Sequence, residues 1–532
     1  MHNTKKRIRN ETILPVLLYG GITGALVGLM ITVFKFCAQH VLSVSTTVYA
    51  LCAAQPHVLW LVLPALALLS LGIALLCKWL PNIRGGGIPT SIGILRGVIP
   101  FHWLSNLIGV LLASMASFLV GVPLGTEGPS VQIGTLLGRG VARTTVKKHA
   151  VWDRYMMTGG ACAGFAAATG APISGILFAI EEAHQRISPL VFSVAATAVV
   201  AAQTVSEALC PLLGVETKLF SAFALPRLAV RELWLPVVIG LVGGGASILF
   251  LKIYRRLNAL WDEKTEKIPA FCKYIFLFGI TLMLGILYGG FVSTGHGLIE
   301  TLMHGGGIWY LLLAALLLRS LLMILCSANG VTGGLFLPIL TLGAILAALL
   351  GRCVTAFCGV PATYYPVIVM LGITTAIAGM MKMPITAVVF AVEVLSASEN
   401  ILAVIITAAI AYAVTEIFYI DSINEHVLDD RIHELHKGKH AEAYDAHLVL
   451  QEGSFAIGKQ SRDLLWPSGL VVLSFKREKK TKTVVDAYGE KVLRPGDELH
   501  VRYSTYDHAE TLREIEAIVG KQDGTEKVLQ QI

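Results

Sequence analysis

The chain has 532 residues, of which 55% are hydrophobic and only 14% are charged, and its mean hydropathy is +0.69. A soluble globular protein carries roughly 25% charged residues, so the composition excludes a single soluble enzyme or binding domain. The charges are also unevenly spread. Residues 421–532 contain 20 acidic and 16 basic residues, whereas the part before them is a long apolar body.

The N-terminal segment, residues 1–12, carries four basic side chains directly before the first long apolar run: Lys5, Lys6, Arg7 and Arg9. Apolar runs of similar length recur along the body, and about 20 such residues are needed to cross a bilayer. The sequence therefore predicts an all-α polytopic membrane protein. Basic residues beside a span favour the cytoplasmic side, so the net charge of +7 indicates topology and does not indicate nucleic-acid binding.

Three pairs of segments repeat along the body in the same order and at nearly constant spacing. The pairs are 85–90 with 295–300, 128–138 with 337–347, and 170–182 with 382–394. This pattern predicts an internal duplication with copies at about 13–215 and 230–425, inside a transmembrane domain spanning 13–431. Whether the copies run parallel or inverted is left open by these residues, although repeats of both kinds place substrates near the membrane midplane.

Three glycine-rich stretches interrupt the apolar runs: Gly85–Gly87, Gly125–Gly128 and Gly333–Gly334. Each stretch precedes a helix-forming run, and a helix start offers unpaired N–H groups with a partial positive charge. The pattern predicts an anion site made of backbone amides, against the alternative that the glycines serve helix packing. Glu127 lies within the second stretch, where an ionisable group is costly unless it functions. A carboxylate there can compete with the anion when ionised and carry a proton when neutral.

These residues resemble the CLC family of chloride channels and chloride/proton antiporters. The signatures GGGIP at Gly85–Pro89, GTEGP at Gly125–Pro129 and GGLFLP at Gly333–Pro338 occur in the family's order. The resemblance implies the CLC-type inverted-repeat fold with broken helices. It also implies a homodimer with one pathway per subunit, and chloride and protons as the transported partners.

By motif position, the resemblance implies that Glu127 is the gating glutamate and that Glu182 is the inner proton-transfer glutamate. It implies anion-binding positions at Gly86, Gly87, Ile88, Gly125, Gly128, Leu335, Phe336 and Asn424. The alternative for Glu182 is a charged helix end at the cytoplasmic boundary. Glu393 aligns with Glu181 in the duplication, which suggests a structural role.

Two positions depart from the family pattern. Gly86 stands where the family usually has serine, and Asn424 stands where a tyrosine hydroxyl is usual. Both residues that usually contribute side-chain ligands to the central anion are therefore changed, although the Asn424 amide can still donate a hydrogen bond. These departures put chloride selectivity and tight proton coupling in question.

The charged C-terminal part is divided into a linker at 432–446, a module at 447–520 and a tail at 521–532. The segment 433–449 is expected to be a charged helix or linker, and two alternating runs, 470–478 and 497–503, predict strands. A helix is expected at 508–520. The module resembles the C-terminal domain of TrkA and RCK regulatory subunits, which suggests a small regulatory ligand, and an α+β fold in the cytoplasm. It has no GxGxxG motif that would bind NAD.

No cofactor or metal site is expected. The nine cysteines show no CxxC spacing and are interpreted as buried thiols. The histidines at 433, 436 and 440 are interpreted as solvated linker residues. A membrane-embedded hydrolase is disfavoured because HExxH is absent, and a potassium transporter because no TVGYG-like filter occurs. The prediction is a chloride/proton exchanger in a bacterial inner membrane with both termini cytoplasmic. The alternatives are a voltage- or proton-gated chloride channel, or a CLC-type transporter of nitrate or fluoride.

Overall fold

The structure is a computed structural model of the chain. It describes residues 13–145, 151–437, 440–477, 491–522 and 526–529. The predicted cytoplasmic segment 1–12, with its four basic residues, lies outside the described residues, as do parts of the predicted linker and tail.

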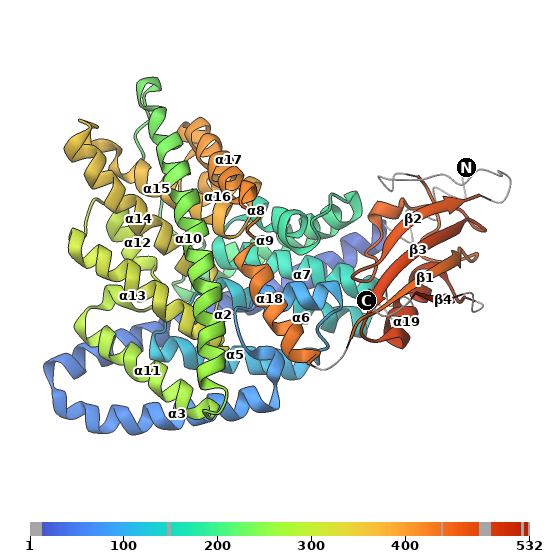
Figure 1. Cartoon of the computed structure of the whole chain (residues 1–532), viewed down its shortest axis with the longest axis horizontal. Coiled ribbons are helices and arrows are strands. Elements are labelled where there is room, and N and C mark those ends of the chain that lie inside the picture. The colour runs from blue at the N-terminus through green and yellow to red at the C-terminus, as the bar shows by residue number, and fades with distance from the viewer. Residues whose placement is uncertain (1–12, 146–150, 438–439, 478–490, 523–525, 530–532) are drawn as a thin grey trace.

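The chain forms a helical body followed by a small mixed domain at one end (Figure 1). The first half of the body contains α2 (Leu14–Ala54), α3 (Leu59–Trp79), α4 (Ile88–Arg96), α5 (Trp103–Val120), α6 (Glu127–Thr145), α7 (Trp152–Thr169), α8 (Pro172–Phe178) and α9 (Pro189–Leu213). The second half contains α10 (Trp234–Thr265), α11 (Ala270–Leu287), α12 (His296–Met303), α13 (Trp309–Ala328), α14 (Phe336–Phe357), α15 (Tyr365–Met380), α16 (Pro384–Val394) and α17 (Ile401–Ile417), and α18 (Ile423–Leu435) closes the body.

Among the described residues, ten helical segments are long and apolar enough to cross a membrane. Several other helices are too short to span it, including α4, α8 and α12, as expected for broken helices. Prolines sit at the first turns of many helices, where the missing N–H costs no intrahelical bond; α8, α9 and α16 each begin with one. The two halves present matching series of helices in the same order, which agrees with the predicted duplication.

The copies are inverted, and two carboxylates show it. Glu181, which follows α8, accepts hydrogen bonds from the backbone N–H groups of Ile385 (2.9 Å) and Thr386 (2.6 Å) at the start of α16. Glu393, near the end of α16, accepts from the N–H groups of Ile173 (2.8 Å) and Ser174 (2.9 Å) at the start of α8. Each helix therefore ends beside the beginning of the other. The two run antiparallel and cap one another.

This reciprocal capping predicts the effect of Glu181→Gln. A carboxylate at a helix start binds N–H groups and complements the helix dipole. We expect the neutral amide to lower the stability of the body by roughly 1.5–3 kcal/mol, the range for a hydrogen bond to a charged group. The measurement is the midpoint of heat-induced loss of monodisperse protein in detergent. Glu416→Gln is the control, because Glu416 is 58% exposed and its ion pair with Lys382 should contribute little. Equal midpoints for both variants would contradict the expectation.

In the described residues of the C-terminal domain, an antiparallel four-stranded sheet is accompanied by one α-helix. The strands are β1 (Glu442–Val449), β2 (Val471–Lys476), β3 (Glu498–Thr505) and β4 (Glu526–Leu529), in the order β2-β3-β1-β4. In the central pair, Ala446 lies opposite Val501, and both side chains are fully buried. The helix α19 (His508–Val519) buries Ile515, Ile518 and Val519. The domain therefore has its own small apolar core.

Two predicted strands and the predicted final helix of this domain are confirmed as β2, β3 and α19. The charged helix or linker expected at 433–449 is wrong over its second half, because residues from Glu442 form β1. β1 pairs with β3 on one side and β4 on the other, so sheet pairing overrides the weak helical preference of this segment. The predicted linker, 432–446, thus includes the end of α18 and the first five of the eight residues of β1.

Candidate functional site

Two of the three glycine signatures are joined by their backbones. Gly125 and Gly334 form an antiparallel bridge, in which the N–H of each donates to the carbonyl oxygen of the other at 2.7 Å. Each glycine stands two residues before a helix, since α6 begins at Glu127 and α14 at Phe336. The bridge therefore brings the N-terminal ends of α6 and α14 together from opposite halves of the duplication.

The first signature contacts the same place. The Gly85 N–H donates to the Gly330 carbonyl at 3.1 Å, and the Gly85 carbonyl accepts from the Gly333 N–H at 3.3 Å. The carbonyl oxygen of Gly86 lies so close to Gly128 that a Cβ on Gly128 would be 2.0 Å from it. Segments far apart in the sequence thus form one backbone cluster, which we call the three-loop cluster.

The starts of α6 and α14 make this cluster electropositive. In both helices a proline, Pro129 or Pro338, is the third residue, and the first helical hydrogen bond is accepted by the residue before the helix. Helix geometry then leaves the N–H groups of the first two residues without a partner inside the helix. Two helix starts with free donors and partial positive charge form a favourable environment for an anion.

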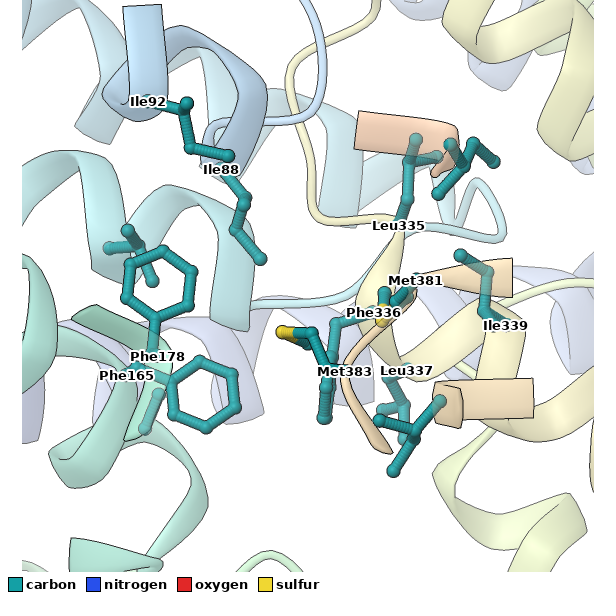
Figure 2. Close-up of a cluster of buried hydrophobic side chains, with 14 of the residues drawn as sticks. Ile88, Ile92, Phe165, Phe178, Leu335, Phe336, Leu337, Ile339, Met381 and Met383 are labelled. Carbon is teal, nitrogen blue, oxygen red and sulfur yellow. The ribbon is translucent and has the colours of Figure 1, made fainter. Parts of the chain in front are cut away.

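The side chain of Phe336 is packed into an aromatic cluster. Its ring meets the rings of Phe165 and Phe390 edge-on, with centroids 5.1 and 5.3 Å apart, and Phe165 stacks on Phe178 at 5.8 Å. Figure 2 shows Phe165, Phe178 and Phe336, together with Ile88 and Leu335, among the buried apolar side chains of this region. The packing fixes the first residue of α14, so its backbone is held in place while its side chain is buried.

Glu127 is fully buried at the first position of α6. Its Oε1 accepts a hydrogen bond of 3.4 Å from the Thr126 hydroxyl, and no donor among the described residues bonds to Oε2. A Cβ placed on Gly125 would lie 2.2 Å from that Oε2 and 3.0 Å from Leu337 Cβ. The carboxylate therefore lies over the bridge between the two helix starts. The sequence predicts that an anion competes with the carboxylate for this position.

Glu182 is 3% exposed and lies in a π-helical turn, Ala179–Ala183, directly after α8. Its Oε1 accepts a hydrogen bond of 2.8 Å from Nδ2 of Asn424. It also lines a cavity of about 540 Å³ together with Glu181, Gln185 and Glu425. The structure thus brings Glu182, the predicted inner glutamate, into contact with Asn424. The sequence predicted Asn424 to bind the anion and did not predict this contact.

The space beside Gly86 is consistent with a side chain at this position. A Cβ there would lie 3.4 Å from Pro89 Cδ and 3.5 Å from Leu335 Cγ, which are ordinary contact distances. Gly87 differs, because its φ is +75° and a Cβ would lie 2.3 Å from the Gly128 carbonyl group. Within this signature the backbone favours glycine at Gly85, whose φ is +87°, and at Gly87, whereas Gly86 has no such requirement.

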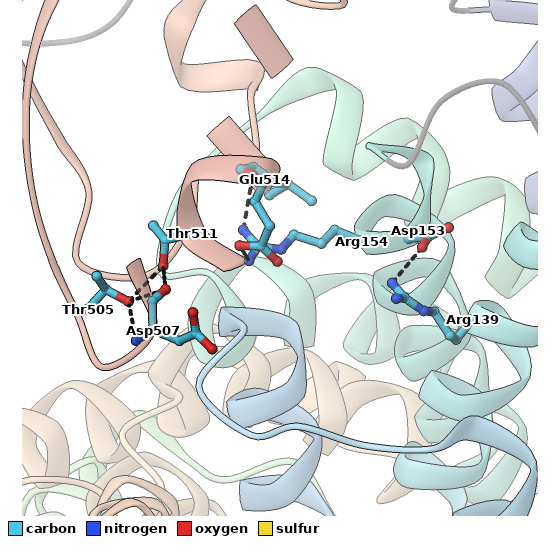
Figure 3. A network of polar contacts seen from close by, with 8 residues as sticks. Arg139, Asp153, Arg154, Thr505, Asp507, Thr511 and Glu514 are labelled. Atoms are coloured by element: carbon cyan, nitrogen blue, oxygen red, sulfur yellow. Dashed lines mark hydrogen bonds and ion pairs between the residues drawn. The ribbon is translucent and has the colours of Figure 1, made fainter. Parts of the chain in front are cut away.

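The C-terminal domain contacts the body through polar side chains whose pairing is not predicted by the sequence. Arg154 of α7 forms an ion pair of 2.7 Å with Glu514 of α19 (Figure 3). The Tyr155 hydroxyl donates to the Asp463 carbonyl at 2.5 Å, and Ser188 donates to the Asp463 carboxylate at 3.1 Å. Arg154 and Tyr155 are polar residues on a mostly apolar helix, which suggests a polar contact at this point. No sequence pattern identifies their partners.

Comparison with known proteins identifies the family of the chain. The sequence profile of the family described as "Voltage gated chloride channel" matches residues 66–416. The H(+)/Cl(-) exchange transporter ClcA of Salmonella arizonae is 29% identical over 413 residues, which cover 75% of this chain and 85% of that protein. The ClcA protein of Salmonella typhimurium gives the same identity and coverage.

Solved structures share the fold. A slow cyanobacterial Cl⁻/H⁺ antiporter has a TM-score of 0.70 at 23% identity, over 78% of this chain and 98% of that one. A CLC-type fluoride/proton antiporter has a TM-score of 0.58 at 18% identity, over 76% of this chain and 96% of that one. The chain therefore belongs to the CLC family of voltage gated chloride channels and related transporters, and it is a multi-pass membrane protein for anion transport, not an enzyme.

Proposed function

We propose that the chain exchanges chloride for protons, with Glu127 as gate and outer proton carrier and Glu182 as inner proton-transfer residue. The observation that carries the proposal is the Glu127 carboxylate, fully buried over the bridge between the starts of α6 and α14. The electropositive N-terminal ends of α6 and α14 would stabilise both a negative charge at this position and a bound anion. The similarity to named H(+)/Cl(-) exchange transporters supports the same function.

In the proposed cycle, ionised Glu127 and chloride take turns at the three-loop cluster. Protonation removes the charge of Glu127, so its carboxyl group is no longer held by the helix starts and chloride can enter. Loss of the proton regenerates the carboxylate, which returns to the cluster and displaces the anion. Glu182, beside its cavity, exchanges protons with the cytoplasm. Backbone dipoles bind an anion without a full positive charge, which suits a site that must also release it.

The deciding experiment uses the full-length protein in liposomes with a chloride gradient and no initial pH difference. We expect chloride flow down its gradient to drive protons uphill, until a protonophore collapses the pH difference. Chloride flux that moves no protons would favour the rival function, a gated anion channel. The residues at positions 86 and 424 favour that alternative, because both usual side-chain ligands of the central anion are changed.

Chloride is proposed as the main substrate because it is the anion of the named relatives. A relative in fold transports fluoride, and Gly86 offers no hydroxyl to select among halides. A series of chloride, bromide, nitrate and fluoride gradients in the same liposomes tests this choice. If proton pumping is strongest with nitrate or fluoride, that anion and not chloride is the main substrate.

We further propose a homodimer with one pathway per subunit, in a bacterial inner membrane, with both termini in the cytoplasm. The proposed domains are a transmembrane domain at 13–431 and a TrkA-C-like regulatory module at 447–520, and the sheet of that module extends beyond both bounds, from β1 at Glu442 to β4 at Glu526–Leu529. A small ligand at that module is part of the proposal. Cross-linking in membranes tests the dimer, and protease access to the C-terminal domain in inverted vesicles tests its side.

A further inference from the structure

The Asn424 side chain is fixed on Glu182 by its position at the start of α18. Asn424 is 1% exposed, and its Nδ2 donates to Glu182 Oε1 at 2.8 Å, although the two residues are 242 positions apart. The helix does not need this amide as a cap, because the Ser422 hydroxyl accepts from the Glu425 N–H at 3.1 Å. The hydrogen-bonding capacity of Asn424 is therefore available for the carboxyl group.

The first turn of α18 is held from two further sides. Glu425 forms a two-pronged ion pair with Arg96, the last residue of α4, with one bond of 2.9 Å, and it accepts a longer bond of 3.3 Å from Gln185. Leu428 packs against Gly93 of α4. α4 begins in the GGGIP signature. The turn that carries Asn424 is therefore attached to a helix whose N-terminal end lies at the three-loop cluster.

An amide suits both protonation states of a carboxyl group. Its N–H donates to an ionised carboxylate, and after rotation its carbonyl oxygen accepts from a protonated one. A leucine of similar volume can do neither. An aspartate would oppose ionisation, because two carboxylates at this distance repel. The residue at position 424 can thus set how easily Glu182 takes up and gives back its proton.

We propose that Asn424 is a positioning residue for proton transfer, which orients Glu182 and serves as its hydrogen-bond partner in both protonation states. This inference rests on the proposed exchange function. It assigns Asn424 to the proton branch of the cycle, in contrast to the anion-ligand role expected from its place in the sequence. The two roles predict different defects when the amide is removed.

The test measures proton and chloride fluxes together in liposomes for wild type, Asn424→Leu and Asn424→Asp. In Asn424→Leu we expect proton transport to fall by about tenfold, the factor typical of losing a hydrogen bond to a charged group. Chloride flux and the preference for chloride over nitrate should stay close to wild type. Unchanged proton transport, or a loss of chloride preference in place of proton transport, would overturn the inference.

A second readout is independent of transport. Infrared difference spectra of the purified protein at low pH contain the carbonyl stretch of protonated Glu182, which is assigned by its disappearance in Glu182→Gln. Asn424→Leu should move this band to higher frequency, because the protonated carboxyl group loses its hydrogen-bond partner. An unmoved band would overturn the inference even if wild type fails to pump protons. Wild-type pumping by itself decides the exchange function, so the two failures are distinguishable.

Discussion

Glu127→Gln is expected to abolish chloride-driven proton transport while leaving chloride flux in place. Glutamine has nearly the same shape as glutamate, but it neither carries a proton nor competes with an anion as a negative charge. The side chain is fully buried and is folded over the bridge between the starts of α6 and α14. We expect proton flux to fall by roughly a hundredfold or more, in line with the removal of an essential proton-transfer group.

The measurement is the simultaneous record of proton and chloride movement in liposomes under a chloride gradient. Glu207→Gln provides a matched control, because Glu207 is an exposed glutamate on α9 whose carboxylate accepts from Gln203. It should keep the proton-to-chloride ratio of wild type. Continued proton pumping by Glu127→Gln would remove this residue from the proton path and would leave the buried carboxylate unexplained.

The convergence of the signature stretches could be predicted from the sequence. The stretches belong to the repeated segments, and their glycines and prolines are typical of the ends of broken helices. Their convergence is visible in the Gly125–Gly334 bridge and in the contact between Gly86 and Gly128. The repeat also contains a signal for how its two copies pack, namely a pair of aligned glutamates. Glu181 and Glu393 align in the duplication, and each faces the proline-started helix of the other copy.

Other contacts leave no trace in the sequence. Asn424 and Glu182 lie far apart in the sequence, and α4 packs against both α18 and the π-helical turn Ala179–Ala183 that carries Glu182. The family position alone suggested an anion ligand. The strand β1 was mistaken for a charged helix or linker because small alanines, such as Ala443 and Ala446, fill its buried positions and weaken the alternation. Pairing with strands far along the chain decides its conformation, and local preference does not.

Gly128→Ala is expected to disable the three-loop cluster. The added Cβ would lie 2.0 Å from the carbonyl oxygen of Gly86 and 2.6 Å from Cα of Gly334. Both atoms belong to backbone that the Gly125–Gly334 bridge and the helix starts hold in place, so neither side can yield as a flexible side chain would. Overpacking of this kind costs roughly 1–3 kcal/mol or more. We expect a lower midpoint of thermal unfolding and a loss of chloride flux of about tenfold or greater, since displaced amides no longer converge.

Gly86→Ala is the matched control, because it adds the same methyl group to the same cluster. Its Cβ would meet Pro89 and Leu335 only at 3.4 Å and beyond, so stability and chloride flux should stay near wild type. Gly86→Ser then adds a hydroxyl donor to a tolerated side chain, and it should strengthen chloride preference over nitrate if the anion rests beside the first signature. Equal damage from Gly128→Ala and Gly86→Ala would show that the cluster does not depend on the close backbone contact. Normal flux in Gly128→Ala would mean that the anion is held elsewhere.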